Sequence, residues 1–343
     1  MFIPKYNVSS KLLENIKRIS VFISQLNGQY FSQAVLVKLE KKANEISAYA
    51  STSIEGNPLP LTEVKRIIKS SPEHIRDTER EVLNYNKALE KLNADLKQGA
   101  VKLTLGSILK IQAMVTDGLI VDFNSGKLRQ GPVVVNDPVA RKIKYLPPDH
   151  QDVPALMENL LEFINSNEKK IDPLVLAGIF HKQFVVIHPF MDGNGRTARL
   201  ATKALLANLG LDTFNLFSFE NYYNRNVTKY FQFVGESGNY YDIKEAVDYT
   251  PWLEYFTDGI IDELIRVSEE LKTLSITPET VLSEYQQIIL DHIKKNGYIA
   301  DKIYSNLVKR SKPSRVNDFN KLIRLGLIER IGKGKATIYK SKQ

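Results

Sequence analysis

Thirteen residues at positions 187–199, IHPFMDGNGRTAR, bring together side chains that could carry out phosphate chemistry. His188 is the one group in this stretch whose unperturbed pKa suits proton removal near neutral pH. Asp192 follows and offers a hard carboxylate oxygen of the kind that binds Mg²⁺. Gly193 and Gly195 then leave the backbone free of Cβ atoms, so that an anion could approach it closely.

The stretch is expected to lead into a helix, because the apolar run at 200–209 is typical of a helix that ends at Gly210. The backbone N–H groups of Gly193-Asn194-Gly195, together with the positive end of that helix dipole, would hold a phosphate. Arg196 and Arg199 would share one helix face and suit further phosphate oxygens. The segment therefore predicts a nucleotide triphosphate site with a base that activates an incoming hydroxyl group.

Each feature of this stretch also has a simpler structural reading. A histidine before a proline is often structural, and a Gly-x-Gly pair is often only a turn. A folding role, however, does not need a base, an acid, a cradle and paired arginines within one short segment. Their joint occurrence favours the functional interpretation.

The elements that must position the stretch are predicted to be mostly helical. One helix is brought to an end by Gly56-Asn57-Pro58, and Asp172-Pro173 is a typical start for another. The segment 131–148 differs, because β-prone runs at 133–135 and 142–145 flank an Asn-Asp-Pro turn and predict a hairpin. Helices are expected at about 36–55, 77–96, 105–115, 153–164 and 173–186.

Composition limits the class of protein. The 343 residues suggest two or three domains, and 43% apolar with 25% charged residues is ordinary for a folded soluble chain. The absence of cysteine excludes thiol nucleophiles, disulfides and cysteine-ligated zinc. The sequence has no run of eighteen apolar residues and no apolar stretch typical of a signal peptide, so we expect a cytoplasmic protein without a membrane partner.

The basic charge of the chain is concentrated at its C-terminal end. Positions 282–343 hold 14 Lys and Arg against 5 Asp and Glu, a net charge of +9, while the whole chain carries +8. Helices expected at about 282–295, 301–308 and 314–325, followed by strands at 327–331 and 336–340, predict a winged helix. Its candidate phosphate contacts are Lys312, Arg315, Lys321, Lys333 and Lys335. A DNA role and a protein-binding role both remain open.

The motif at 188–199 resembles that of the Fic family, His-Pro-Phe-x-Asp/Glu-Gly-Asn-Gly-Arg-x-x-Arg, at every specified position. The resemblance covers roughly 30–260, including a helix with His181, the hairpin and the region of Trp252. It implies a helical fold and transfer of AMP from ATP to a Ser, Thr or Tyr hydroxyl of a protein. The hairpin resembles the family's flap, which pairs with the target backbone. A plain connector is the alternative for this hairpin.

The resemblance also implies a role for each motif residue. His188 would be the general base, Asp192 the Mg²⁺ ligand, and Asn194 and Gly195 the anion hole. Arg196 and Arg199 would be the phosphate clamps. A lysine replaces the second glycine in the related phosphotransferase branch, so Gly195 favours nucleotidyl transfer over γ-phosphoryl transfer.

A second motif, STSIEGN at 51–57, resembles the inhibitory Ser/Thr-x-x-x-Glu-Gly/Asn motif of Fic proteins. It implies that Ser51 and Glu55 belong to an inhibitory helix and that Glu55 pairs with Arg199, the arginine needed by the γ-phosphate. The alternative is a solvated residue at a helix end. Glu55 could instead position a water and support removal of AMP from modified targets. The segment 235–250 departs from the family by its length and lies near the expected nucleotide side.

We therefore expect a mainly α protein with a Fic-type helical core, a β-hairpin flap and a C-terminal winged helix-turn-helix domain. The expected segments are an N-terminal helical region with the inhibitory helix (1–100), the catalytic core (101–271), a linker (272–281) and the winged helix (282–343). Expected partners are an unknown hydroxyl-bearing target, the protein itself by self-modification, DNA or protein at the winged helix, and a second copy in a homodimer. Alternative functions are transfer of another nucleotide or phosphate-linked group and DNA-binding regulation.

Overall fold

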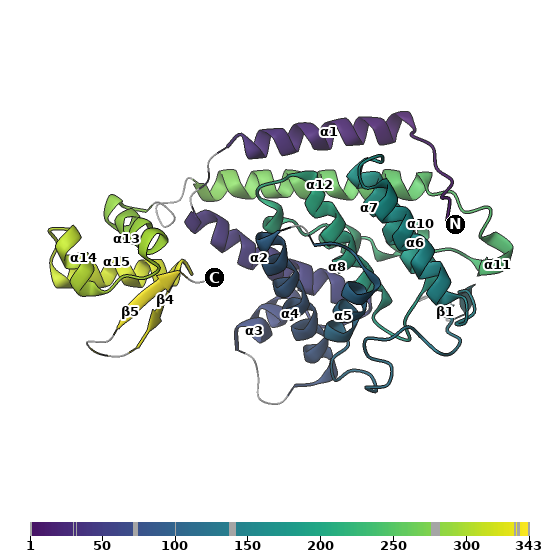
Figure 1. Ribbon diagram of the computed structural model, residues 1–343, viewed down its shortest axis with the longest axis horizontal. Helices are drawn as coiled ribbons and strands as arrows, with labels where there is room; N and C mark the ends of the chain where they lie inside the picture. Colours follow the sequence, from purple (N-terminus) through teal and green to yellow (C-terminus); the bar gives the residue numbers. More distant parts are fainter. Residues whose placement is uncertain are drawn as a thin grey trace. The chain divides into compact units, whose positions relative to one another are not determined.

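The computed structural model is mainly helical, as expected, and is shown in Figure 1. It describes residues 2–29, 31, 33–70, 75–99, 101–136, 142–275, 282–332, 334 and 337–341. The chain forms two compact units. The first comprises Met1–Asn27 and Ala43–Ile265, and the second comprises Gly28–Lys42 and Arg266–Gln343. Each unit is described by itself below.

The elements follow one another in this order. The helices are α1 (Ser10–Asn27), α2 (Gln33–Ile54), α3 (Leu61–Ser70), α4 (Asp77–Gln98), α5 (Leu105–Val115), α6 (Val153–Asn167), α7 (Pro173–Ile187), α8 (Asn194–Leu206), α9 (Glu220–Asn224), α10 (Val227–Val234), α11 (Tyr240–Ile243), α12 (Thr250–Ser275), α13 (Glu284–Asn296), α14 (Asp301–Leu307) and α15 (Lys312–Arg324). The strands are β1 (Val135–Asn136), β2 (Ile143–Leu146), β3 (Gly238–Asn239), β4 (Ile328–Ile331) and β5 (Ile338–Ser341).

Helix α7 lies at the centre of the first unit. Nearly all of its side chains are buried, as expected for a helix that is apolar on every face. Asp172 caps it by accepting a hydrogen bond from the Leu174 N–H at 2.9 Å, and Pro173 occupies the first turn, as the sequence predicts. Helix α8, which is also mostly buried, packs against α7 and reaches a left-handed glycine, Gly210, through one 3-10 turn.

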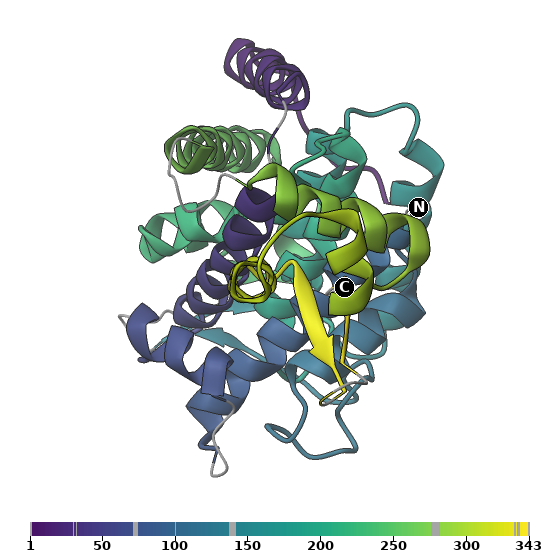
Figure 2. The ribbon, with the colours of Figure 1, turned by 90° about the vertical axis from the view of Figure 1, so that its left-hand side faces the viewer.

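Helix α1, which the sequence analysis did not identify, lies alongside α12 in both views (Figures 1 and 2). Its buried Asn15 donates hydrogen bonds to the Thr257 hydroxyl at 2.9 Å and to Asp258 at 2.8 Å. Leu12 and Ile19 on the same face of α1 are fully buried. Helix α1 is thus an integral part of the first unit.

The predicted hairpin is formed by β1 and β2, which pair antiparallel. Its expected turn falls partly on residues 137–141, which lie outside the described residues. The unexpected feature is β3, which pairs parallel with β2 through Tyr145 opposite Gly238. The long segment 235–250 therefore adds a third strand to the flap sheet, and Tyr240 packs with Tyr145 and Val186 beneath it.

The predicted linker is helical in its first part, contrary to expectation. Helix α12 continues to Ser275 and so includes the first residues of segment 272–281. Apolar spacing alone missed this extension because the last turn of α12 is polar. The rest of the segment, 276–281, lies outside the described residues.

The C-terminal region has the predicted order of three helices followed by two strands, and β4 pairs antiparallel with β5. Ser283 and Gly297 delimit α13 as an N-cap and a left-handed C-cap. Ile299 also bridges to Tyr339 on β5. The winged-helix assignment remains a prediction, because the order of elements alone does not establish this fold. What the region binds is likewise a prediction.

One proposed phosphate contact of this region is already engaged within the protein. Arg315 donates to both carboxylate oxygens of Asp301, at 2.8 and 3.0 Å, and to the Arg310 carbonyl at 2.8 Å. Its guanidinium therefore joins α15 to the start of α14 rather than pointing to a ligand. Lys333 and Lys335 lie outside the described residues.

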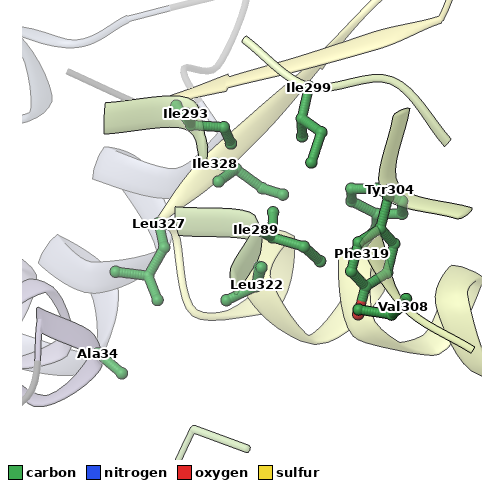
Figure 3. Packing of buried hydrophobic residues seen from close by; sticks show 10 residues of the cluster. All are labelled: Ala34, Ile289, Ile293, Ile299, Tyr304, Val308, Phe319, Leu322, Leu327 and Ile328. Atoms are coloured by element: carbon green, nitrogen blue, oxygen red, sulfur yellow. The ribbon is translucent and has the colours of Figure 1, made fainter. Parts of the chain in front are cut away.

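The core of the second unit is a cluster of apolar side chains from its helices and strands (Figure 3). Phe319 is 1% exposed and stacks on Tyr339 with ring centroids 4.0 Å apart. Tyr304 meets Phe319 edge-on, and its hydroxyl donates to the buried Asp318 at 2.8 Å. Ala34 from segment 28–42 also belongs to this cluster.

In the part of the chain that the structure describes, no helix combines the length and the apolar character needed to cross a membrane.

We predict that Phe319→Ala destabilises the second unit by about 3–5 kcal/mol, because it removes a fully packed ring and leaves a cavity. The sole tryptophan, Trp252, lies in the first unit, so its fluorescence follows that unit separately. Far-ultraviolet circular dichroism should show a helical transition at lower denaturant, with an unchanged fluorescence transition. Ile323→Ala, at a side chain 36% exposed on the same helix, is the control. Equal effects of the two variants would contradict the packing argument.

Candidate active site

The motif loop joins α7 to α8 and begins with an unusual backbone conformation. His188 ends α7 by donating its N–H to the Phe184 carbonyl at 3.0 Å and adopts φ 51° and ψ 60°. It is the only non-glycine residue with positive φ in the described part of the chain. Such a conformation is disfavoured for residues that carry a Cβ, so the surrounding contacts must hold it.

Asn194 closes the motif loop through its side chain. Its Oδ1 accepts a hydrogen bond from the Phe190 N–H, and its Nδ2 donates to the Phe190 carbonyl, both at 2.9 Å. The amide therefore fixes the backbone of Phe190 relative to the start of α8.

Backbone N–H groups without a helical partner lie at the start of α8, where the sequence predicts an anion cradle. The N–H of Thr197 donates to the Gly193 carbonyl at 2.9 Å, so the N–H groups of the residues between them have no partner within the helix. Gly193 is left-handed, with φ 80°. The free N–H groups and the positive end of the helix dipole thus coincide at the N-terminus of α8.

A carboxylate of the protein already lies at this cradle. A Cβ atom placed on Gly195 would come within 2.0 Å of Oε1 of Glu55 and within 3.0 Å of Nη1 of Arg199. Glu55 follows directly after α2 and is 30% exposed in its side chain. The Glu55 carboxylate therefore stands where the sequence analysis expected a phosphate.

Arg199 is held by both residues of the second motif. Its Nη2 donates to Oε1 of Glu55 at 2.7 Å and to the Ser51 carbonyl at 2.8 Å, and its Nε donates to the Ser51 hydroxyl at 2.7 Å. The guanidinium is fully buried. Burial disfavours its charge, but Glu55, Tyr230 and Tyr85 together outweigh burial and hold the pKa of Arg199 above its usual range.

Arg196 makes contacts that the sequence did not suggest. Its Nη1 pairs with Oε1 of Glu81 on α4 at 2.9 Å, and its Nη2 pairs with Oδ2 of Asp192 at 3.1 Å. The other oxygen of Glu81 accepts a hydrogen bond from the Asn57 amide at 2.7 Å. Nothing in the local sequence pattern indicates Glu81, because it approaches the motif only through the packing of α4 against α8.

Asp192 is the candidate Mg²⁺ ligand. Its carboxylate is half exposed, with one oxygen near Arg196 and the other accepting from the Gly193 N–H at 2.6 Å. Among the described residues no group of three or more acidic or histidine side chains could hold a metal alone. Mg²⁺ commonly binds through one or two carboxylates together with water and substrate phosphates. A single half-exposed carboxylate beside an anion cradle fits that pattern.

The surroundings of His188 favour its neutral imidazole. Burial lowers its pKa to about 4, although the Val185 carbonyl, Glu55 and Asp192 act in the opposite direction. The imidazole is consequently neutral near pH 7. Its Nδ1 lies 3.3 Å from the Val185 carbonyl. If Nδ1 carries the hydrogen and donates there, Nε2 retains a free lone pair.

His181 has a structural role by contrast. It is fully buried, with Nδ1 3.0 Å from the Thr202 hydroxyl and Nε2 2.9 Å from the Tyr230 hydroxyl. Since the Thr202 hydroxyl donates to the Ala198 carbonyl, it accepts from Nδ1. Burial, assisted by the charge of Arg199, lowers the pKa of His181 to about 3.

The comparison with known families agrees with this geometry. Residues 102–206 match the family described as Fic/DOC. This confirms the family resemblance that the motif predicted. The matched range includes the flap hairpin, α7 and the motif loop.

Two Drosophila proteins are similar to part of the chain. A protein adenylyltransferase Fic of Drosophila erecta is 31% identical over 194 residues, which are 54% of this chain and 36% of that protein. The Drosophila melanogaster protein of the same name is 30% identical, with 54% and 37% covered. The chain thus matches little more than a third of the length of these relatives.

Solved structures support the fold alone. A Fic family protein from Desulfovibrio desulfuricans G20 has a TM-score of 0.67 at 20% identity and covers 99% of this chain and 98% of that chain. A Fic domain containing signaling protein from Bacteroides thetaiotaomicron VPI-5482 has a TM-score of 0.62 at 21% identity, with 76% and 98% covered. The Fic-type helical fold expected from the sequence is confirmed.

We predict that His181 makes unfolding pH-dependent. Its folded pKa lies below the unfolded value, so the unfolded state binds a proton first and stability falls as pH drops below about 6.5. Between about pH 7 and about pH 5, the wild type should lose about 2 kcal/mol more than His181→Gln, which cannot titrate. Denaturant titrations of both proteins at both pH values measure this difference. Parallel pH dependence would show that His181 is not held neutral by burial.

Proposed function

We propose that this chain is a protein adenylyltransferase that transfers AMP from ATP to a Ser, Thr or Tyr hydroxyl of a target protein and of itself. One observation carries the proposal: His188 and the backbone N–H groups at the start of α8 belong to one short loop that Asn194 closes through its hydrogen bonds to Phe190. Gly195, rather than a lysine, favours nucleotidyl transfer. The names of the Drosophila relatives support the same activity.

The proposed reaction uses His188 as a general base. The hydroxyl oxygen attacks the α-phosphorus, the bond to the bridging oxygen breaks, pyrophosphate departs, and Nε2 of His188 receives the proton. A positioned base typically contributes about 10²–10⁴-fold to such a step. Arg196 and Arg199 would stabilise charge on the phosphates. Mg²⁺, which Asp192 would hold, supplies further positive charge at the phosphate oxygens.

The contact between Glu55 and Arg199 makes the protein autoinhibited under this proposal. The carboxylate occupies the guanidinium that a γ-phosphate would need and lies against Gly195. A preference of about 2.7 kcal/mol for this arrangement would leave about one molecule in a hundred competent. Because Glu55 is partly exposed, it can move into solvent when a nucleotide takes its place.

The flap is the proposed site for the target backbone. Strand β3 covers one edge of β2, and β1 covers the other, so the outer edge of β1 remains for an added strand. Side chains alternate along β1, and Val134 just before it is 45% exposed. An extended target segment there would present its hydroxyl side chain toward the motif loop.

DNA binding through the C-terminal region is the alternative function. The observation that Arg315 pairs with Asp301 removes one of the five proposed phosphate contacts. Lys312 remains exposed at the start of α15. Gel shifts at physiological salt separate specific binding from simple charge attraction.

We predict that Glu55→Gly raises AMP transfer by up to about 100-fold, because the competent fraction rises from about one in a hundred toward one. Incorporation of α-labelled phosphate from ATP measures the effect, and γ-labelled ATP in parallel detects a kinase. Glu55→Gln, which keeps the size of the side chain but loses its charge, should give an intermediate rate. Equal rates in wild type and Glu55→Gly would refute the inhibitory role, and γ-label alone would refute AMP transfer.

The same variant tests removal of AMP. If Glu55 also positions a water, loss of label from a purified modified substrate should slow in Glu55→Gly. Unchanged loss of label would exclude this second activity.

We predict that His188→Ala abolishes transfer in the Glu55→Gly background while ATP affinity changes little, since the histidine takes a proton and is not a proposed phosphate ligand. Calorimetry with Mg²⁺ and ATP measures affinity beside the transfer rate. A parallel collapse of affinity and rate would mean that His188 binds the nucleotide instead.

A further inference from the structure

Arg129 is a buried cation that touches both the motif loop and the base of the flap. It is 3% exposed and lies in the segment between α5 and β1. Its Nε donates to the His188 carbonyl at 2.9 Å, and its backbone N–H donates to the Pro189 carbonyl at 2.9 Å. Two adjacent carbonyls of the motif loop are therefore held by one residue.

The remaining nitrogens of Arg129 hold the flap. Nη1 donates to the Gly131 carbonyl at 3.0 Å, and Nη2 donates to the Pro148 carbonyl. These two carbonyls mark the two ends of the segment 131–148. One planar guanidinium thus joins both ends of the flap to the backbone of His188.

Burying the Arg129 guanidinium in this way lowers the free energy of unfolding relative to an apolar side chain that packs equally well. Within the described part of the chain, the guanidinium donates to three backbone carbonyls and to no carboxylate. Burial lowers the pKa of Arg129, with Asp149, Tyr145 and Tyr241 acting against that shift. A buried charge without an ion-pair partner is costly, and apolar packing would stabilise a loop more cheaply. An apolar residue, however, could not donate three hydrogen bonds in the fixed planar geometry of a guanidinium.

We propose that Arg129 is a positioning residue that sets the flap and the catalytic histidine in one fixed relation, so that the target hydroxyl bound by the flap meets the base. The proposal rests on the function proposed above. His188 needs such support because its left-handed backbone is disfavoured on its own. The flap needs it because its strands are short, with β1 spanning Val135–Asn136 only.

Arg129 also acts on the charge of His188. The guanidinium favours the neutral imidazole, whereas Glu55 from α2, Asp192 from the motif loop and the Val185 carbonyl favour the protonated form. Loss of the Arg129 charge should therefore raise the pKa of His188. Since the base must be neutral, the acidic limb of the rate profile should move to higher pH.

Two variants in the Glu55→Gly background test the proposal. Arg129→Gln removes the charge, and Arg129→Lys keeps it without the planar fork. Both should lower kcat about 10–100-fold through misalignment while ATP affinity by calorimetry is unchanged. Only Arg129→Gln should shift the acidic limb. Amide hydrogen exchange in a peptide covering 142–148 should become faster in both variants.

Ile19→Ala controls for a general loss of stability, because Ile19 is fully buried in α1 of the same unit. It should unfold more easily yet keep the flap exchange and kcat of its parent. Unchanged flap exchange and kcat in the Arg129 variants would overturn the proposal, as would equal changes in Ile19→Ala. If the Glu55→Gly parent transferred no label, the proposed function would fail, and flap exchange would still decide whether Arg129 joins the two segments.

Discussion

The buried guanidinium of Arg199 pairs with a carboxylate, and this ion pair determines the arrangement of the residues around it. In the structure the partner is Glu55, with Ser51 accepting further hydrogen bonds. A nucleotide phosphate would meet the same need at the same N-terminus of α8. Glu55 lies directly against Gly195 at this position, since a Cβ on Gly195 would come within 2.0 Å of its Oε1. Under the proposed function, a phosphate bound at this helix end would therefore have to displace Glu55.

The backbone of the motif loop accepts hydrogen bonds from the side chains of three residues. Asn194 closes it from within, Gln112 on α5 donates to the Asp192 carbonyl at 3.1 Å, and Arg129 holds the carbonyls at its beginning. Electrostatic stabilisation of a transition state works only if the donors are already oriented before the reaction. The polar residues around the loop are thus better understood as fixing the orientation of backbone groups than as contacts to substrate.

Local patterns predicted the ends of the helices around the motif, although they missed other elements such as α1. Asp172 and Pro173 started α7, and Gly210 ended the helical run after α8, because caps and breakers act on neighbouring residues. What could not be predicted were contacts between distant segments. The pairing of β3 with β2 and the ion pair of Arg196 with Glu81 arise from packing that no periodicity encodes. The motif predicted where a site would lie, and that remains a prediction, but it gave no indication of the partners that orient its side chains.

The energetic balance at Arg199 explains why a single residue could govern the site under the proposed function. Arg199 stays buried whether its partner is Glu55 or a phosphate, so its desolvation cost is common to both states and cancels in their difference. Glu55 is partly exposed and returns to water at little cost. The two states then differ by a few kcal/mol rather than by the much larger cost of an unpaired buried charge. The two contacts are then thermodynamically linked. The contact of Glu55 with Arg199 weakens nucleotide binding by some free energy, and bound nucleotide weakens the contact of Glu55 by the same free energy.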